Sequence, residues 1–189
     1  INAQGGTDRI YGGDGADSIN AGDGNDFVYA GTGNDTVTAS NGFDQLYGEA
    51  GNDSLSGGSD FYDDLYGGVG DDSIYAGNYG DNWVFGGEGN DLLYGGGGAL
   101  DLVRGGAGND TAYGGNGDDQ VVGGTGNDLV SGDAGNDRVS GDDGADTVDG
   151  GTGADTIEGG QGHDSLIGGD GADLIRGDIR SFDPAAYAS

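Results

Sequence analysis

A nine-residue pattern recurs without interruption through almost the whole chain. From Ala3 to Arg176 the sequence divides into 19 consecutive units of the form G-G-x-G-x-D-x-U-x, in which U is a large aliphatic residue. Sixteen units have nine residues, and the units that begin at Gly57, Ala76 and Gly95 have ten. A unit this short cannot bury its own apolar side chain, so the units must stack, and the pattern predicts a repeat architecture.

Each unit predicts a glycine-rich turn of six residues followed by a strand of about three. Glycine admits the positive φ angles of tight turns, and the x-U-x segment alternates outward, inward and outward as a strand does. Position eight is Ile, Val or Leu in every unit except the one with Ala112, and this column is the predicted core. The predicted fold is all-β: a right-handed parallel β-roll, or β-helix solenoid, whose two parallel sheets face each other across the aliphatic column.

Composition narrows the class of protein further. The 189 residues include 49 glycines, a fraction that indicates disorder in an aperiodic sequence and a repeat fold in a periodic one. Five arginines stand against 35 acidic residues, and the net charge of -30 predicts cations as partners and no nucleic acid. The absence of cysteine excludes disulfides and thiolate metal sites. No apolar run is long enough for membrane insertion or a signal peptide.

Position six forms the second regular column. It is Asp in 18 units, with Asn82 as the one exception. Stacked turns would bring these carboxylates together with free backbone carbonyls, and Ca²⁺ takes six to eight such oxygen ligands. A solvated acidic repeat without metal is the alternative. The predicted metal ligands are Asp8, Asp17, Asp26, Asp35, Asp44, Asp53, Asp63, Asp72, Asp91, Asp101, Asp110, Asp119, Asp128, Asp137, Asp146, Asp155, Asp164 and Asp173.

The units resemble the calcium-binding nonapeptides of RTX (repeats-in-toxin) proteins over 174 of the 189 residues, as in GGDGADSIN, GGEGNDLLY, GGTGNDLVS and GGQGHDSLI. The resemblance implies that each Ca²⁺ lies between two turns on the same edge, bound by both Asp side chains and by carbonyls of both turns. One site would use Gly13, Gly15 and Asp17 with Ala30, Thr32 and Asp35. The stacked gaps allow at most 17 ions, whose +34 would nearly balance the charge of -30.

The same reasoning predicts a function. Repelling carboxylates around a thin core predict a chain that is disordered without calcium and folds on binding it. Extracellular calcium modules bind with Kd of ~10⁻⁴ to 10⁻³ M, so folding would follow export. The resemblance implies type I secretion. We expect a calcium-binding structural module of a secreted or cell-surface bacterial protein, with no enzymatic activity. The alternatives are an adhesive, lattice-forming or filament-forming surface protein, and an accessory module of a secreted protease, lipase or alginate epimerase.

Departures from the repeat gather on the odd-numbered units, whose strands share one sheet and whose turns share one edge. All three ten-residue units are odd, and even-edge turns instead carry a regular run of Asn or Asp at position five. Bulky side chains occur in odd-edge turns at Phe43, Phe61, Tyr62, Tyr79 and Leu100. The outward positions of the odd sheet include Tyr11, Phe27, Tyr29, Tyr47, Tyr66, Trp83, Phe85 and Arg104, and the even sheet carries Tyr75, Tyr94 and Tyr113.

This aromatic face has two interpretations. Tyrosines in neighbouring strands stabilise a sheet through cross-strand pairs, and Arg104 at the end of the ladder would add a cation–π contact. A contiguous exposed aromatic face can instead dock a partner. The candidates for this partner are another protein, a second copy of the chain or a surface glycan, and the residues that would meet it are Tyr29, Tyr47, Tyr66, Trp83 and Phe85.

Two single residues, Asn82 and His163, and one short Thr–Asn spacing have interpretations of their own. Asn82 would weaken the two calcium gaps beside it while keeping a neutral oxygen ligand. His163, the only histidine, occupies a variable turn position and is interpreted as a solvated residue, because no zinc-protease, Ser–His–Asp or phosphate-loop motif accompanies it. Ice binding is a further alternative, but the Thr32–Asn34 spacing recurs only at Thr125–Asn127 and not in the coils between.

The predicted domain organisation follows the limits of the repeat. Residues 1–2 form an N-terminal stub, residues 3–176 the calcium-binding roll and residues 177–189 a C-terminal cap or tail. Solenoids need a cap over their terminal coils. In this tail Ile179 and Phe182 are the residues expected to cover the last coil.

Overall fold

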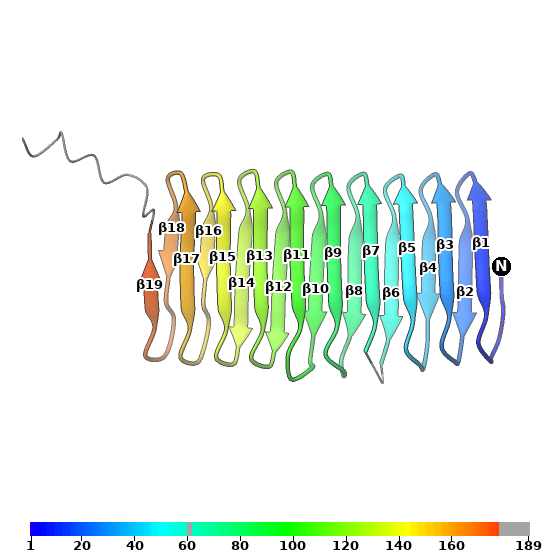
Figure 1. The fold of residues 1–189 in the computed structure, drawn as a ribbon, viewed down its shortest axis with the longest axis horizontal. Coiled ribbons are helices and arrows are strands. Elements are labelled where there is room, and N and C mark those ends of the chain that lie inside the picture. The colour runs from blue at the N-terminus through cyan, green and yellow to red at the C-terminus, as the bar shows by residue number, and fades with distance from the viewer. Residues whose placement is uncertain (60–61, 178–189) are drawn as a thin grey trace, which may run out of the picture.

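Alternate units build alternate sheets. In the computed structural model, which describes residues 1–59 and 62–177, odd-numbered strands form a ten-stranded sheet and even-numbered strands a nine-stranded sheet. All strand pairs named within these sheets are parallel, and the coils follow one another along the long axis of the molecule (Figure 1). The predicted all-β roll with two parallel sheets is confirmed. The described residues contain no helix that could span a bilayer.

The strands have the following bounds. The odd sheet contains β1 (Arg9–Asp14), β3 (Phe27–Thr32), β5 (Gln45–Ala50), β7 (Asp64–Val69), β9 (Trp83–Glu88), β11 (Leu102–Ala107), β13 (Gln120–Thr125), β15 (Arg138–Asp143), β17 (Thr156–Gln161) and β19 (Leu174–Arg176). The even sheet contains β2 (Ser18–Gly22), β4 (Thr36–Ala39), β6 (Ser54–Gly58), β8 (Ser73–Gly77), β10 (Leu92–Gly96), β12 (Thr111–Asn116), β14 (Leu129–Ala134), β16 (Thr147–Asp149) and β18 (Ser165–Ile167).

Most strands are longer than the three residues expected from the sequence. The six-residue strand β9 runs from position seven of one unit to position three of the next. Glycines at positions one and two continue the ladder, as where Gly68 lies opposite Gly87. Because these residues have no Cβ, the backbones of successive coils can approach closely there and pairing continues. The turn proper is therefore only positions four to six.

The core contains two inward-facing columns, where the sequence predicted one. Position eight is buried from Ile10 to Ile157. Position one is also buried, as at Ala21 and Ala30, because the inward and outward alternation of the strand continues across the unit boundary. Towards the C-terminal end the column opens, and Ile175 is 46% exposed. The first column supplies the bulk of the core, and the second consists of alanine and glycine.

The aromatic rings of the odd sheet stack face to face. From Tyr11 to Phe85 the centroids of successive rings lie 4.9–5.3 Å apart, with interplanar angles of 3–10°. Neighbouring rings cover one another's faces, which favours cross-strand stabilisation as the role of this ladder. The cation–π contacts of the described residues are made by Arg9, whose guanidinium lies 5.5 Å from the Tyr29 centroid. The contact expected from Arg104 is not among them.

The ends of the roll differ. The carbonyl of Ile1 accepts a hydrogen bond from the N–H of Asn20 at 2.9 Å, so the first residues pair with the even sheet beside β2. At the other end, β19 is followed by Gly177, the last described residue. The predicted cap residues Ile179 and Phe182 lie outside the described residues.

Candidate metal sites between the turns

Position-six residues form one hydrogen-bonded ladder along each edge of the roll. The backbone N–H of each residue donates to Oδ1 of the position-six residue one coil further on, over 2.6–3.1 Å. These 17 bonds span every predicted gap. All 18 predicted Asp residues therefore lie in the two ladders, with Asn82 as a member of the odd-edge ladder.

In fifteen of these Asp residues the second carboxylate oxygen is buried without a hydrogen-bond partner. Fourteen of the position-six Asp residues are at most 3% exposed, and the four near the ends of the roll are less buried. A buried carboxylate oxygen without a hydrogen bond is costly, so these atoms mark places where a cation would be favourable. In the described residues, the Oδ2 atom lacks a hydrogen-bond partner in Asp8, Asp17, Asp26, Asp35, Asp44, Asp53, Asp72, Asp91, Asp101, Asp110, Asp119, Asp128, Asp137, Asp146 and Asp155.

A carbonyl oxygen of the next coil lies close to these Oδ2 atoms. A Cβ added to Gly150 would lie 2.6 Å from Oδ2 of Asp155 and 2.6 Å from the carbonyl oxygen of Gly168. One small space is thus surrounded by position one of a unit, by the position-six Asp of the same unit, and by position one of the next unit on the same edge. Two oxygens from successive turns face that space, and oxygen is the ligand type that Ca²⁺ prefers.

The site predicted in detail lies in the first two even-edge turns. The N–H of Asp17 donates to Oδ1 of Asp35 at 2.7 Å, and the carbonyl of Thr32 accepts the N–H of Gly15 at 2.6 Å. Oδ2 of Asp17 and the carbonyl oxygen of Ala30 face the same space beside position one of the earlier unit. The structure therefore brings both predicted carboxylates and two of the carbonyl groups predicted as metal ligands to one gap.

Burial changes the protonation of these carboxyl groups. Desolvation raises the pKa of Asp44 and Asp91 to about 6, although the N–H donated from the preceding coil lowers it. For Asp72 and Asp137, desolvation together with neighbouring carboxylates raises the pKa to about 7. The ionised form is therefore disfavoured in these sites, and a bound cation would favour it.

A second ladder runs outside the first on the even edge. Oδ1 of Asn34 accepts the backbone N–H of Asn52 at 3.0 Å, and the series continues to Asn127, which accepts the N–H of Ala145 at 2.9 Å. These bonds point in the opposite direction from those of the Asp ladder, so the successive even-edge turns from Asn34 to Ala145 are joined in both directions. The run of Asn at position five was visible in the sequence, but its bonding to the backbone was not predicted.

The candidate sites depend on pairs of carboxylates and on the backbone. Within the described ranges, no group of three or more His, Cys, Asp or Glu side chains is placed to hold a metal ion. Each gap would instead combine two position-six side chains with turn carbonyls. This donor set contains only oxygen, which suits a hard cation and not zinc or copper.

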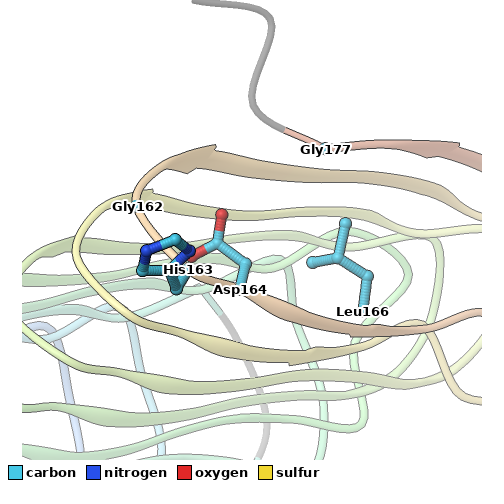
Figure 2. Close-up of a pocket in the computed structure, with 5 residues that line it drawn as sticks. All are labelled: Gly162, His163, Asp164, Leu166 and Gly177. Atoms are coloured by element: carbon cyan, nitrogen blue, oxygen red, sulfur yellow. The ribbon is translucent and has the colours of Figure 1, made fainter. Parts of the chain in front are cut away.

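The single histidine lies on the last even-edge turn, next in sequence to the ladder residue Asp164. His163 is exposed on the turn before β18. Figure 2 shows it beside Asp164, with Leu166 and Gly177 lining the same pocket near the C-terminal end of the roll. Its placement agrees with the interpretation of His163 as a solvated turn residue.

Comparison with known families agrees with the geometry of the ladders. A family model described as RTX calcium-binding nonapeptide repeat (4 copies) matches overlapping segments that together cover residues 2–179. No curated protein matches the chain. The matched segments include every position-six residue of both ladders, and they are residues 2–37, 29–62, 58–78, 76–99, 100–130, 113–148, 122–157 and 149–179.

Proposed function

The chain belongs to the RTX calcium-binding nonapeptide repeat family, and on that premise we propose that it is a structural module that folds when Ca²⁺ occupies the gaps between its turns. Repeats of this family bind calcium, are structural and not catalytic, and occur typically in secreted bacterial proteins. The observation that carries the proposal is the row of buried Oδ2 atoms without hydrogen bonds. A cation would give each of these atoms a partner.

Each gap would be built from the same parts. The Asp of the earlier turn contributes Oδ2, and the carbonyl of position one in the later turn faces it, as in the pair Asp155 and Gly168. The Asp of the later turn contributes Oδ1, which already accepts a backbone N–H. When bound, Ca²⁺ would supply the positive charge that offsets the repulsion and desolvation of the carboxylates. We propose all 18 position-six Asp residues as ligands on this basis.

Counting bound ions tests the proposal. In saturating calcium, native mass spectrometry should detect more than ten and at most 17 Ca²⁺ per chain, since 17 gaps exist. Asp110→Asn, which alters a buried ladder residue, should remove at least one ion because a gap loses a carboxylate. Asp170→Asn, an exposed residue outside the ladders, should leave the count unchanged. Equal counts for all three chains, or a count of only a few ions, would contradict the proposal.

The proposed setting of the module follows from calcium affinity. Extracellular modules of this kind bind with Kd of ~10⁻⁴ to 10⁻³ M, above the free calcium of the cytosol, so the chain would stay unfolded until exported. We propose export by type I secretion and a location outside the cell or on its surface. A surface-lattice protein and a secreted enzyme are two larger contexts in which the same roll would keep this role.

A second candidate function is self-association through the odd edge. Tyr62, Tyr79 and Leu100 are 53–65% exposed in three successive odd-edge turns, and Trp83 on β9 is 51% exposed. A contiguous apolar patch of this kind is typical of an interaction site. Calcium would nearly cancel the charge of -30, so two copies would no longer repel each other. On the ladder of the odd sheet, the rings from Tyr29 to Phe85 are stacked and leave few open faces for a sugar, which favours a second copy over a glycan. Phe61 lies outside the described residues.

Sedimentation velocity in calcium tests this surface. The double variant Tyr79→Ser with Leu100→Ser should lower the fraction of dimer at least several-fold, because it removes two exposed apolar side chains from the patch. Leu129→Ser is the matched control, since Leu129 is 40% exposed but lies on the even sheet. A wild-type chain that is folded in calcium, monomeric at all concentrations and shows the fluorescence of a fully solvated Trp83 would refute self-association.

A further inference from the structure

Asn82 occupies a ladder position that is otherwise always Asp. It is fully buried between Asp63 and Asp101 on the odd edge. Its Oδ1 accepts the N–H of Asp63 at 3.1 Å, and its own N–H donates to Oδ1 of Asp101 at 2.6 Å. The ladder therefore continues through Asn82, and the difference from Asp is confined to the second polar atom of the side chain.

That second atom is Nδ2, which is a donor. It donates to the carbonyl oxygen of Gly80 in its own turn and to that of Gly95 in the next odd-edge turn, each at 3.3 Å. Gly95 is position one of its unit, and at the gap of Asp155 the corresponding carbonyl, of Gly168, faces a carboxylate Oδ2. At this one gap, the carbonyl that would face a cation is instead paired with an N–H group.

The hydrogen bonds also determine which way the amide points. A flipped amide would place Nδ2 against the backbone N–H of Asp63, so that two donors face each other. It would also place Oδ1 against the carbonyl oxygens of Gly80 and Gly95, so that acceptors face each other. Both changes lose hydrogen bonds in a buried place, where an unpaired polar group is costly. Asn82 therefore presents hydrogens, not oxygen, to the gap that it shares with Asp101.

We infer that the gap between the turns of Asn82 and Asp101 binds no calcium, and that the amide of Asn82 takes the place of the ion. The inference rests on the proposed function for the other gaps. The gap on the other side, between Asp63 and Asn82, keeps the amide oxygen as a ligand. The sequence predicts weaker calcium binding in both gaps beside Asn82, whereas the hydrogen bonds of the amide place the effect in the gap shared with Asp101. The limit of 17 ions falls to 16, and the odd-edge ions divide into two groups of four at this point.

The Asn82→Asp variant tests this directly, with Asp119→Asn as its matched control on the same edge. In saturating calcium, native mass spectrometry should show one more ion for Asn82→Asp than for the wild type, and at least one fewer for Asp119→Asn. Equal counts for wild type and Asn82→Asp, with a loss in Asp119→Asn, would overturn the inference while leaving the proposed function intact. A wild-type chain that binds few or no ions would instead refute the proposed function.

Two further measurements do not depend on how Asn82→Asp folds. A wild-type crystal grown in calcium should show anomalous scattering in the neighbouring gaps and none between Asn82 and Asp101, and an ion there would overturn the inference. Asn82→Ala removes the amide without adding a ligand. It should bind no more ions than the wild type, because it also removes Oδ1 from the gap shared with Asp63, and it should need at least twofold more calcium to fold, because the two carbonyls lose their N–H partner. A gain of an ion in this variant, or an unchanged midpoint, would contradict the role of the amide.

Discussion

In excess chelator the far-ultraviolet circular dichroism of the chain is expected to lose its β-sheet signal, and millimolar calcium should restore it. The reason is that, within each unit, the free energy gained by burying apolar side chains must be set against the cost of ordering the backbone. One buried aliphatic side chain stabilises each unit by ~1.5–3 kcal/mol, whereas ordering the backbone of a single residue costs ~1–2 kcal/mol. The fourteen buried Asp residues add a further cost, because each charge is removed from water. Calcium offsets that cost, so its removal should unfold the roll.

The metal dependence should be specific and not a screening effect. The midpoint is expected at ~10⁻⁴ to 10⁻³ M calcium, and magnesium at the same concentration should have little effect because it keeps its water ligands and requires octahedral geometry. Sodium chloride of equal ionic strength controls for the screening of surface charge. A β-sheet signal that persists unchanged in chelator would show that the aliphatic columns and hydrogen bonds alone maintain the fold.

The stacking of the turns was predictable because the spacing of the repeat is nearly constant. Two units return the chain to the same edge, so residues 18 or 19 apart must lie in adjacent coils. Asp26 and Asp44 are 18 apart and Asp44 and Asp63 are 19 apart, and both pairs are joined by the same hydrogen bond. An extra turn residue is absorbed locally because the strands on either side stay in register. The periodicity therefore predicts which side chains meet across each gap.

Features that depend on the direction of individual groups were not predictable from the repeat. The glycine pairs predict turns and so strands of about three residues, but Gly68 and Gly87 pair within the sheet and the strands are longer. The cation–π contact was expected at Arg104 but occurs at Arg9, because its position depends on side-chain conformation and not on spacing. The amide direction of Asn82 depends on backbone donors and acceptors in three successive turns, which a single column of the repeat does not reveal.

Gly89→Ala is expected to be among the most destabilising single substitutions in the roll. Every nine-residue unit has glycine at position four, and in these units its φ lies between 106° and 159°. At Gly89 φ is 133°, a region that side chains other than glycine avoid at a cost of ~1–3 kcal/mol. A Cβ there would also lie 2.5 Å from the carbonyl carbon of Gly70 in the previous coil, and such overpacking costs a further ~1–3 kcal/mol.

The matched control is Gly15→Ala, at the same position in the first even-edge turn. Its φ is 106°, but a Cβ there has no neighbour within 4 Å, because no earlier coil lies against it. Thermal unfolding at fixed calcium should therefore show a much larger fall in Tm for Gly89→Ala than for Gly15→Ala. Equal falls would mean that backbone strain alone makes glycine necessary at position four.

Position two provides the contrast that explains why position four is stricter. Glu49, Asp133 and Asp142 occupy position two with φ of 69–73°, close to the left-handed helical region that side chains can adopt. The chain therefore accommodates a Cβ at position two by a change in φ, whereas the position-four glycines of the nine-residue units remain at 106° or more. Gly87→Asp, at position two of the same unit as Gly89, should accordingly lower the Tm less than Gly89→Ala does. A larger fall for Gly87→Asp would show that charge near the calcium gaps outweighs backbone geometry in setting which residues the turn accepts.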